Sequence, residues 1–242
     1  MKKLKHFVRK ILYKDKASSE DMLNYLRARG AQIGHDVTVF APNNTLIDKT
    51  APWLIKMGDY IRIGEGTRIL THDYAWVVLK RFSSDKMSAG SILGSQGPVE
   101  IGDNVFIGVN VVIVGGVKIG NNVVIGAGSI VTRDCEDNGV YVGNPARRMM
   151  DLEEFYERRK NKIFNEAKKL AIAYKERFSK EPPKEVFTEY FMLFSNVDDA
   201  INCESFKNYM GRSHNYDETV EYMKNNPPLF NSYEEFLKEC YK

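Results

Sequence analysis

The sequence is poor in the residues that build disulfide frameworks and metal sites. Cysteine occurs three times, at Cys135, Cys203 and Cys240, and this odd number and wide spacing match neither a disulfide framework nor a zinc motif. Such cysteine usage is typical of a reducing cytoplasm, which is the location we expect. The net charge of +3 is too small to indicate a nucleic-acid partner.

Long apolar runs are also lacking. No stretch of about 18 or more consecutive apolar residues occurs, so no transmembrane helix is predicted. The basic N-terminus is not followed by an uninterrupted apolar segment, and we therefore expect no signal peptide. A hydrophobic content of 43% over 242 residues is nevertheless sufficient for a substantial core.

The sequence does contain a sustained six-residue period. Its aliphatic members share one phase, and most are followed by glycine: Ile101, Ile107, Ile113, Ile119, Ile125 and Val131. A sustained short period is the signature of a solenoid, in which each repeat buries its apolar face on its neighbours. Six residues match neither a helix nor simple strand alternation, and they favour short strands joined by tight corners.

The same phase extends toward the N-terminus. It is interrupted there by one stretch with weak repeat residues and by one interval that is not a multiple of six. Five further aliphatic residues keep it: Ile33, Val39, Met57, Ile63 and Ile69. Thr45 and Ala51 are weak members, which indicates a degraded or bulged stretch. The interval from Ile69 to Ile101 is not a multiple of six, and we therefore expect an inserted excursion at about residues 75–94. An insertion of this length in a compact domain is typical of a functional loop.

Four segments carry a resemblance to a known family: Phe40–Asn44, Ile101–Gly108, Gly126–Asp134 and Gly143–Arg147. Together they resemble the hexapeptide-repeat acyltransferases. The branch that they resemble most is the sugar and capsular-polysaccharide O-acetyltransferases, which are similar to the galactoside and maltose acetyltransferases. The resemblance covers about residues 30–150.

The resemblance implies a mainly β fold, a left-handed parallel β-helix with three hexapeptides per coil. It also implies a homotrimer with active sites between subunits. We expect three parts: an N-terminal basic helical segment at 1–29, the β-helix acyltransferase domain at 30–149, and a C-terminal α-helical region at 150–242. Within the last part, helical spacing predicts a long helix at 151–179 and shorter helices at 184–195, 199–210, 217–225 and 232–241.

His72 is the candidate catalytic residue. Acyl transfer to a hydroxyl needs a base, and histidine suits this task because its unperturbed pKa is about 6.5. His72 lies in Ile-Leu-Thr-His-Asp, directly before the excursion, and matches the catalytic histidine of the resembling family. We expect it to take the proton of an acceptor hydroxyl that attacks acetyl-CoA directly, and then to protonate the CoA thiolate. Asp73 is not expected to orient His72, because adjacent strand residues point to opposite faces.

The resemblance also implies acetyl-CoA as co-substrate and a carbohydrate as acceptor, with no metal. The positions that match CoA-binding residues are Val109, Ala127, Thr132, Arg133, Pro145 and Arg147. The candidate acceptor-binding residues are Asn43, Asp48 and Trp76. For Trp76 two interpretations stay open, since its ring could stack on a sugar or anchor the loop against a neighbouring subunit.

Other functions remain open at this stage. An N-acetyltransferase that acts on an amino sugar or an antibiotic would use the same residues, and a non-catalytic structural solenoid would need none of them. A zinc enzyme on the same fold, such as a γ-class carbonic anhydrase, would need three converging histidines. The chain has four histidines, and only His72 is well placed for a metal.

Residues 1–16 combine seven Lys and Arg with an apolar stripe: Leu4, Val8, Ile11 and Leu12. One interpretation is a helix packed on the end of the β-helix with its basic face in solvent. The other is weak association with an anionic membrane surface, which would make a cytoplasmic protein peripheral at the inner face of the membrane.

Overall fold

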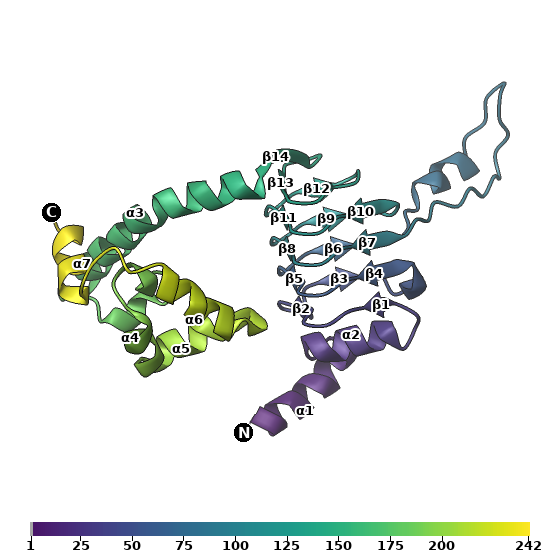
Figure 1. Ribbon diagram of the computed structural model, residues 1–242. Coiled ribbons are helices and arrows are strands. Elements are labelled where there is room, and N and C mark those ends of the chain that lie inside the picture. Colours follow the sequence, from purple (N-terminus) through teal and green to yellow (C-terminus); the bar gives the residue numbers. More distant parts are fainter. Residues whose placement is uncertain (1) are drawn as a thin grey trace. The chain divides into compact units, whose positions relative to one another are not determined.

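The computed structural model describes the backbone of residues 2–242 and the side chains from Val8 onward. The chain divides into two compact units, Met1–Phe155 and Tyr156–Lys242 (Figure 1). The first unit holds all the strands, and the second is helical. The domain boundary between residues 149 and 150, placed from the sequence, stays a prediction.

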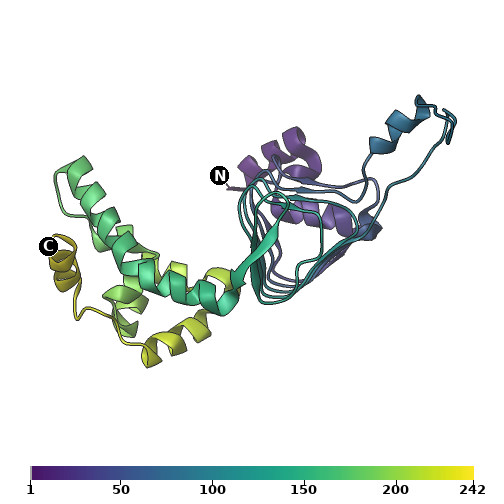
Figure 2. The same cartoon turned by 90° about the horizontal axis from the view of Figure 1, so that it is seen from above.

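Short parallel strands form the three faces of a β-helix, which gives a triangular cross-section in Figure 2. Face A contains β1 (Gln32–Ile33), β4 (Ile55–Met57), β7 (Val99–Ile101) and β10 (Val117–Ile119). Face B contains β2 (Thr38–Val39), β5 (Arg62–Ile63), β8 (Val105–Ile107), β11 (Val123–Ile125), β13 (Gly139–Val142) and the antiparallel β14 (Arg147–Asp151). Face C contains β3 (Leu46–Ile47), β6 (Arg68–Ile69), β9 (Val112–Ile113) and β12 (Ile130–Val131). The fold class predicted from the sequence is confirmed.

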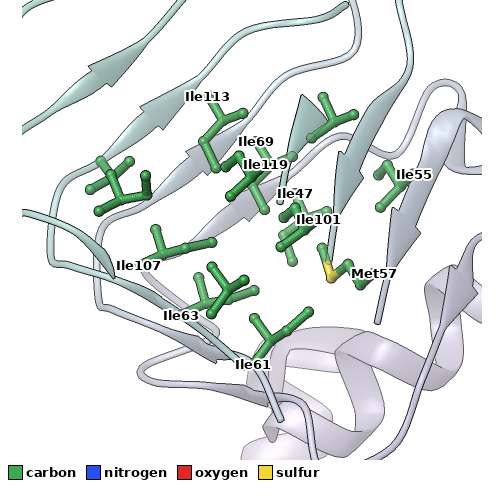
Figure 3. Close-up of a cluster of buried hydrophobic side chains, with 14 of the residues drawn as sticks. Ile47, Ile55, Met57, Ile61, Ile63, Ile69, Ile101, Ile107, Ile113 and Ile119 are labelled. Carbon is green, nitrogen blue, oxygen red and sulfur yellow. The ribbon is translucent and has the colours of Figure 1, made fainter. Parts of the chain in front are cut away.

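The repeat-phase aliphatic residues fill the interior of the β-helix, stacked in columns (Figure 3). Strand offsets in the upper coils are regular, since Val105, Val112 and Val99 each pair with the residue 18 positions later in the next coil. Three six-residue repeats therefore make one coil there. Each coil can bury its isoleucines only against the coils above and below, which makes the stack cooperative.

The first coil is longer than the period predicts. Ile33 pairs with Met57, so the interval between them forms a single coil. The sequence phase counts it as four six-residue repeats, whereas a regular coil contains three. The expected bulged stretch is confirmed, but Thr45 and Ala51 do not occupy the repeat position within it. Ile47 takes the buried position on β3, while the Thr45 hydroxyl donates to the carbonyls of Phe40 and Ala41. The extra residues lengthen the turns before and after β3, the second of which holds the 3-10 turn η2 (Pro52–Leu54).

Removing one of the stacked isoleucines tests this core. Ile113 is fully buried, so Ile113→Ala is expected to lower the free energy of unfolding by about 2–5 kcal/mol, because it leaves a cavity between coils that cannot collapse. Leu46→Ala, at a half-exposed position of the same face, is the matched control and should stay within about 0.5 kcal/mol. Equal unfolding midpoints in a denaturant titration of the two variants would contradict this account of the core.

Two segments of the first unit depart from the β-helix. At the N-terminal end, α1 (Lys2–Tyr13) and η1 (Lys14–Lys16) precede α2 (Ser19–Arg27), whose residues Met22, Leu23 and Leu26 join the β-helix core. Between β6 and β7 the chain leaves the stack as an extended excursion that contains η3 (Ala75–Lys80) (Figure 1).

The second unit is built mainly from the long helix α3 (Leu152–Phe178), which begins in the first unit and agrees within a residue with the predicted helix. Shorter elements follow: η4 (Lys184–Phe187), η5 (Phe191–Leu193), α4 (Val197–Asn202), α5 (Glu204–Met210), η6 (Arg212–His214), α6 (Tyr216–Asn225) and α7 (Tyr233–Cys240). The predicted helix at 184–195 is thus two separate 3-10 turns.

The core of the second unit is aromatic, with Phe187, Phe206 and Phe236 fully buried. Within the described part of the chain, no helix has both the length and the apolar character needed to cross a membrane.

Candidate active site

The turns that join face C to face A stack into one column, the C–A corner. Each turn follows directly on a strand of face C, and backbone hydrogen bonds hold successive turns in register. Asp48 N donates to Ile69 O, Leu70 N to Ile113 O, and Val114 N to Val131 O. The turns therefore bring residues from four coils to one edge: Asp48–Thr50, Leu70–His72, Val114–Gly116 and Thr132–Asp134.

His72 lies in this column and is fixed through one ring nitrogen. Its Nδ1 is 2.6 Å from Asp48 Oδ2 and 3.2 Å from Thr50 Oγ1. A carboxylate can only accept a hydrogen bond, so the proton lies on Nδ1, which donates to Asp48. Nε2 is then left with a free lone pair, which is the tautomer that a general base needs. The side chain is 37% exposed and lines a cavity that a substrate can enter.

Asp48 is held ionised beneath the histidine. Its carboxylate is buried and accepts hydrogen bonds from the Thr71 hydroxyl at 2.5 Å and the Thr50 hydroxyl at 2.7 Å, besides the contact with His72. Burial alone would raise the pKa of Asp48, but the bonds from Thr71, Thr50 and His72 together hold it well below its ordinary value. An ionised carboxylate at this position stabilises a positive charge on the imidazole.

A cavity of about 460 Å³ opens in front of His72. It is lined by Thr50, His72, Tyr74, Trp76, Gly94, Ser95 and Gln96. Tyr74 and Trp76 pack edge to face, with ring centroids 4.8 Å apart, and thereby form an aromatic wall. The cavity thus combines a base, an apolar flat surface and several polar groups, a mixture suited to a sugar.

The neck of the excursion is closed by Asp73. Its carboxylate accepts from the Ser95 hydroxyl at 2.6 Å and from the Ala75 backbone N–H, while its own N–H donates to Ser95 O. His72 also forms an isolated antiparallel bridge with Gln96. Asp73 therefore holds the two ends of the excursion together beside the base, through bonds to Ser95 and Ala75.

The candidate cofactor residues fall on two different edges of the β-helix. Thr132 and Arg133 belong to the C–A corner, two coils above His72. Val109 and Ala127 stack at the corner between faces B and C, where Gly128 N donates to Val109 O. Pro145 and Arg147 follow β13 near that second corner, and all six side chains are exposed. Within one chain, the six candidate cofactor residues therefore form two separate groups, one at each edge.

The candidate acceptor residues are divided in the same way. Trp76 lines the cavity of His72, but the exposed Asn43 lies in the turn between β2 and β3, at the corner between faces B and C. Asp48 is buried, and its oxygens already bind Thr50, Thr71 and His72. A sugar hydroxyl cannot reach a carboxylate in this position, so Asp48 is better placed to orient His72 than to bind an acceptor.

Sequence reasoning missed Thr50 and Thr71, and it did not connect Asp48 with His72. The signal was available in part, because a carboxylate flanked by threonine and placed one coil before a histidine can reach it. The long first coil concealed that spacing. Among the described residues there is no group of three or more His, Cys, Asp and Glu side chains that could hold a metal.

The comparisons with known proteins identify the family of the chain. Residues 98–133 match the model of the bacterial transferase hexapeptide family (six repeats). Protein CapG of Staphylococcus aureus is 36% identical over 138 residues, which are 57% of this chain and 73% of CapG. The chain belongs to the hexapeptide transferase family. It is an acetyltransferase of this family, with helical additions at both ends of the β-helix.

Further relatives match shorter stretches. The putative acetyltransferase YvoF of Bacillus subtilis is 37% identical over 109 residues, which cover 45% of this chain and 55% of YvoF. Among solved structures, a maltose O-acetyltransferase from Clostridium difficile is 28% identical, with coverage of 61% of this chain and 84% of that chain and a TM-score of 0.40.

Proposed function

We propose that this hexapeptide transferase moves the acetyl group of acetyl-CoA to a hydroxyl group of a sugar or a surface polysaccharide. The observation that carries the proposal is the His72–Asp48 pair, whose free Nε2 faces a cavity with an aromatic wall. The family supports the acetyl donor, since solved relatives include a hexapeptide acetyltransferase from Vibrio cholerae in complex with acetyl-CoA. The aromatic wall of Tyr74 and Trp76 supports a carbohydrate acceptor.

The proposed mechanism follows from the fixed tautomer. Nε2 of His72 takes the proton of the attacking hydroxyl, and the imidazolium that forms is stabilised by Asp48, which remains ionised. The same proton is then delivered from Nε2 to the departing CoA sulfur. No acyl-enzyme is needed, because the acceptor and the donor meet at the same base. Thr50 and Thr71 act through Asp48 by keeping its carboxylate charged and in place.

The positions proposed for acetyl-CoA are chemically suited to it. Arg133 and Arg147 are exposed guanidinium groups, which bind phosphate by paired hydrogen bonds. Ala127 is a small exposed residue between Gly126 and Gly128, where an extended arm can approach the backbone closely. We further propose a homotrimer, in which one chain supplies the His72 edge of each site and its neighbour supplies the Val109–Ala127 edge. The separation of the two edges within one chain supports this arrangement.

Mixed trimers test the shared site. His72→Ala and Ala127→Trp should each abolish most activity, the first by removing the base and the second by filling the proposed channel. When the two variants are co-expressed, we expect about a quarter of wild-type activity, since each mixed trimer regains one intact interface. If each site lies within one chain, the mixture stays as inactive as its parents, and the shared site is wrong.

The acceptor is tested by acetyl-CoA turnover, followed as thiol release, with matched panels of neutral sugars, amino sugars and streptogramin-type drugs. We expect release with neutral sugars or polysaccharide and a base-labile ester in the product. Release that requires an amine and yields an alkali-stable amide would instead establish N-acetylation. The His72→Ala protein is the control for release that does not depend on the site.

A further inference from the structure

We propose that α1 is an interfacial anchor, which lays one apolar face on an anionic membrane surface. The first observation is the distribution of charge. Residues 1–16 contain seven Lys and Arg and one acidic residue, whereas residues 17–242 contain 28 Lys and Arg against 31 Asp and Glu. The positive net charge of the protein therefore comes entirely from this segment.

The second observation is the exposure of the apolar side chains of α1. Val8, Ile11 and Leu12 are spaced so that they lie on one side of the helix, and they are 47%, 64% and 67% exposed. The end of the β-helix is covered instead by α2, through the buried Met22, Leu23 and Leu26. Figure 1 shows α1 extending beyond α2, away from the strands. Val8, Ile11 and Leu12 are thus not used to cap the core.

The third observation is that α1 is tied to the protein through its polar side. The Arg9 guanidinium donates to Ala17 O at 2.9 Å, and Lys10 Nζ is 3.1 Å from Asp21 Oδ1. These contacts are made by side chains outside the stripe of Val8, Ile11 and Leu12, which stays exposed. A helix with an exposed apolar stripe and a dense basic flank is the arrangement that binds in the plane of a membrane interface.

The positive charge of residues 1–16 favours an anionic membrane as the binding partner of α1. Lys and Arg near a bilayer are attracted by anionic lipid headgroups, and this attraction falls off within a Debye length. Three apolar side chains without a lipid anchor give only weak, reversible insertion, so both contributions are needed. We therefore expect binding to vesicles that contain anionic lipid and release by salt. A nucleic acid would use the basic residues but would gain nothing from Ile11 and Leu12.

Vesicle co-sedimentation of the full-length protein tests the proposal. The protein should pellet with phosphatidylcholine vesicles that contain phosphatidylglycerol, and remain in the supernatant with phosphatidylcholine alone. Ile11→Lys adds positive charge while it removes apolar area, so it separates the two contributions. We expect about tenfold weaker binding from this variant, whereas attraction by charge alone would make binding equal or tighter.

Leu229→Lys is the matched control, because it also replaces an aliphatic side chain of similar exposure, 66%, with lysine, in the helical unit. It should bind vesicles as well as the wild type does. Undiminished pelleting of Ile11→Lys, no pelleting of the wild type, or equal loss in both variants would each overturn the proposal. Thiol release from acetyl-CoA in the absence of lipid should be unchanged in Ile11→Lys, so this test and the test of acetyl transfer fail independently.

Discussion

Replacement of His72 by alanine is expected to lower kcat for acetyl transfer by about 10²–10⁴-fold, the usual contribution of a positioned general base. The variant should fold, since the ring is partly exposed and contributes no apolar core. KM for acetyl-CoA should change little, because the positions proposed to bind the cofactor lie in other coils. Steady-state thiol release, with the melting temperature as a check of folding, measures both quantities.

His35→Ala is the control for this substitution. His35 occupies a turn between faces A and B, where its backbone N–H donates to Asp59, and is remote from the C–A corner. Its replacement should leave kcat near the wild-type value. If His72→Ala retains near-normal turnover, or if His35→Ala loses as much, the assignment of the base is wrong.

The second large effect is expected from Asp48→Asn. The amide keeps the size of the side chain, but its NH₂ can donate to Nδ1 and so favour the tautomer that carries the proton on Nε2. This tautomer cannot act as a base, and the imidazolium loses its counter-charge. A loss of about 10²–10⁴-fold in kcat is expected, since the corresponding change in serine proteases costs about 10⁴-fold. The pH profile of kcat should shift as well, which a merely structural defect would not produce.

The same substitution carries a signature in stability. The pKa of Asp48 is lowered in the folded protein, so its carboxylate stabilises the fold above the unfolded pKa of about 3.9 and loses this effect as the pH falls below it. Asp48→Asn should therefore lower the unfolding free energy more at neutral than at acidic pH. Urea titrations across this range measure the difference.

Asp103→Asn is the matched control for the chemistry. Asp103 accepts a hydrogen bond from Asp59 N in a turn column, and Asn121 plays the same part in the next coil, accepting from Asp103 N. An asparagine is therefore compatible with this type of position. Asp103→Asn should retain its turnover and pH profile, and an equal loss in both variants would argue against a special role of Asp48.

Much of the fold could be predicted because the six-residue period is a direct consequence of coil geometry. Ile107, Ile113 and Ile119 share a phase in the sequence, and all three are fully buried in the core. The excursion could be located because it breaks that phase between Ile69 and Ile101. Periodicity reports inward-facing positions faithfully, since every coil must bury the same face.

The pairing of Asp48 with His72 could not be predicted in this way. In regular coils of 18 residues, Leu54 would lie one coil below His72. The lengthened turn after β3 changes this offset, so that Ile47 pairs with Ile69 and Thr50 takes the place beneath His72. Periodicity cannot locate such insertions, because turn residues carry no core-facing signal. The division of the cofactor positions between two edges was hidden for the same reason, as it depends on which corner each turn occupies.

The most direct test of the account is the structure of the protein in complex with CoA. We predict that the CoA sulfur lies within about 3.5 Å of Nε2 of His72, where it can receive the proton. The pantetheine arm should follow Val109 and Ala127 of a neighbouring chain. A CoA molecule bound with its sulfur remote from His72, against another part of the chain, would contradict the proposed active site.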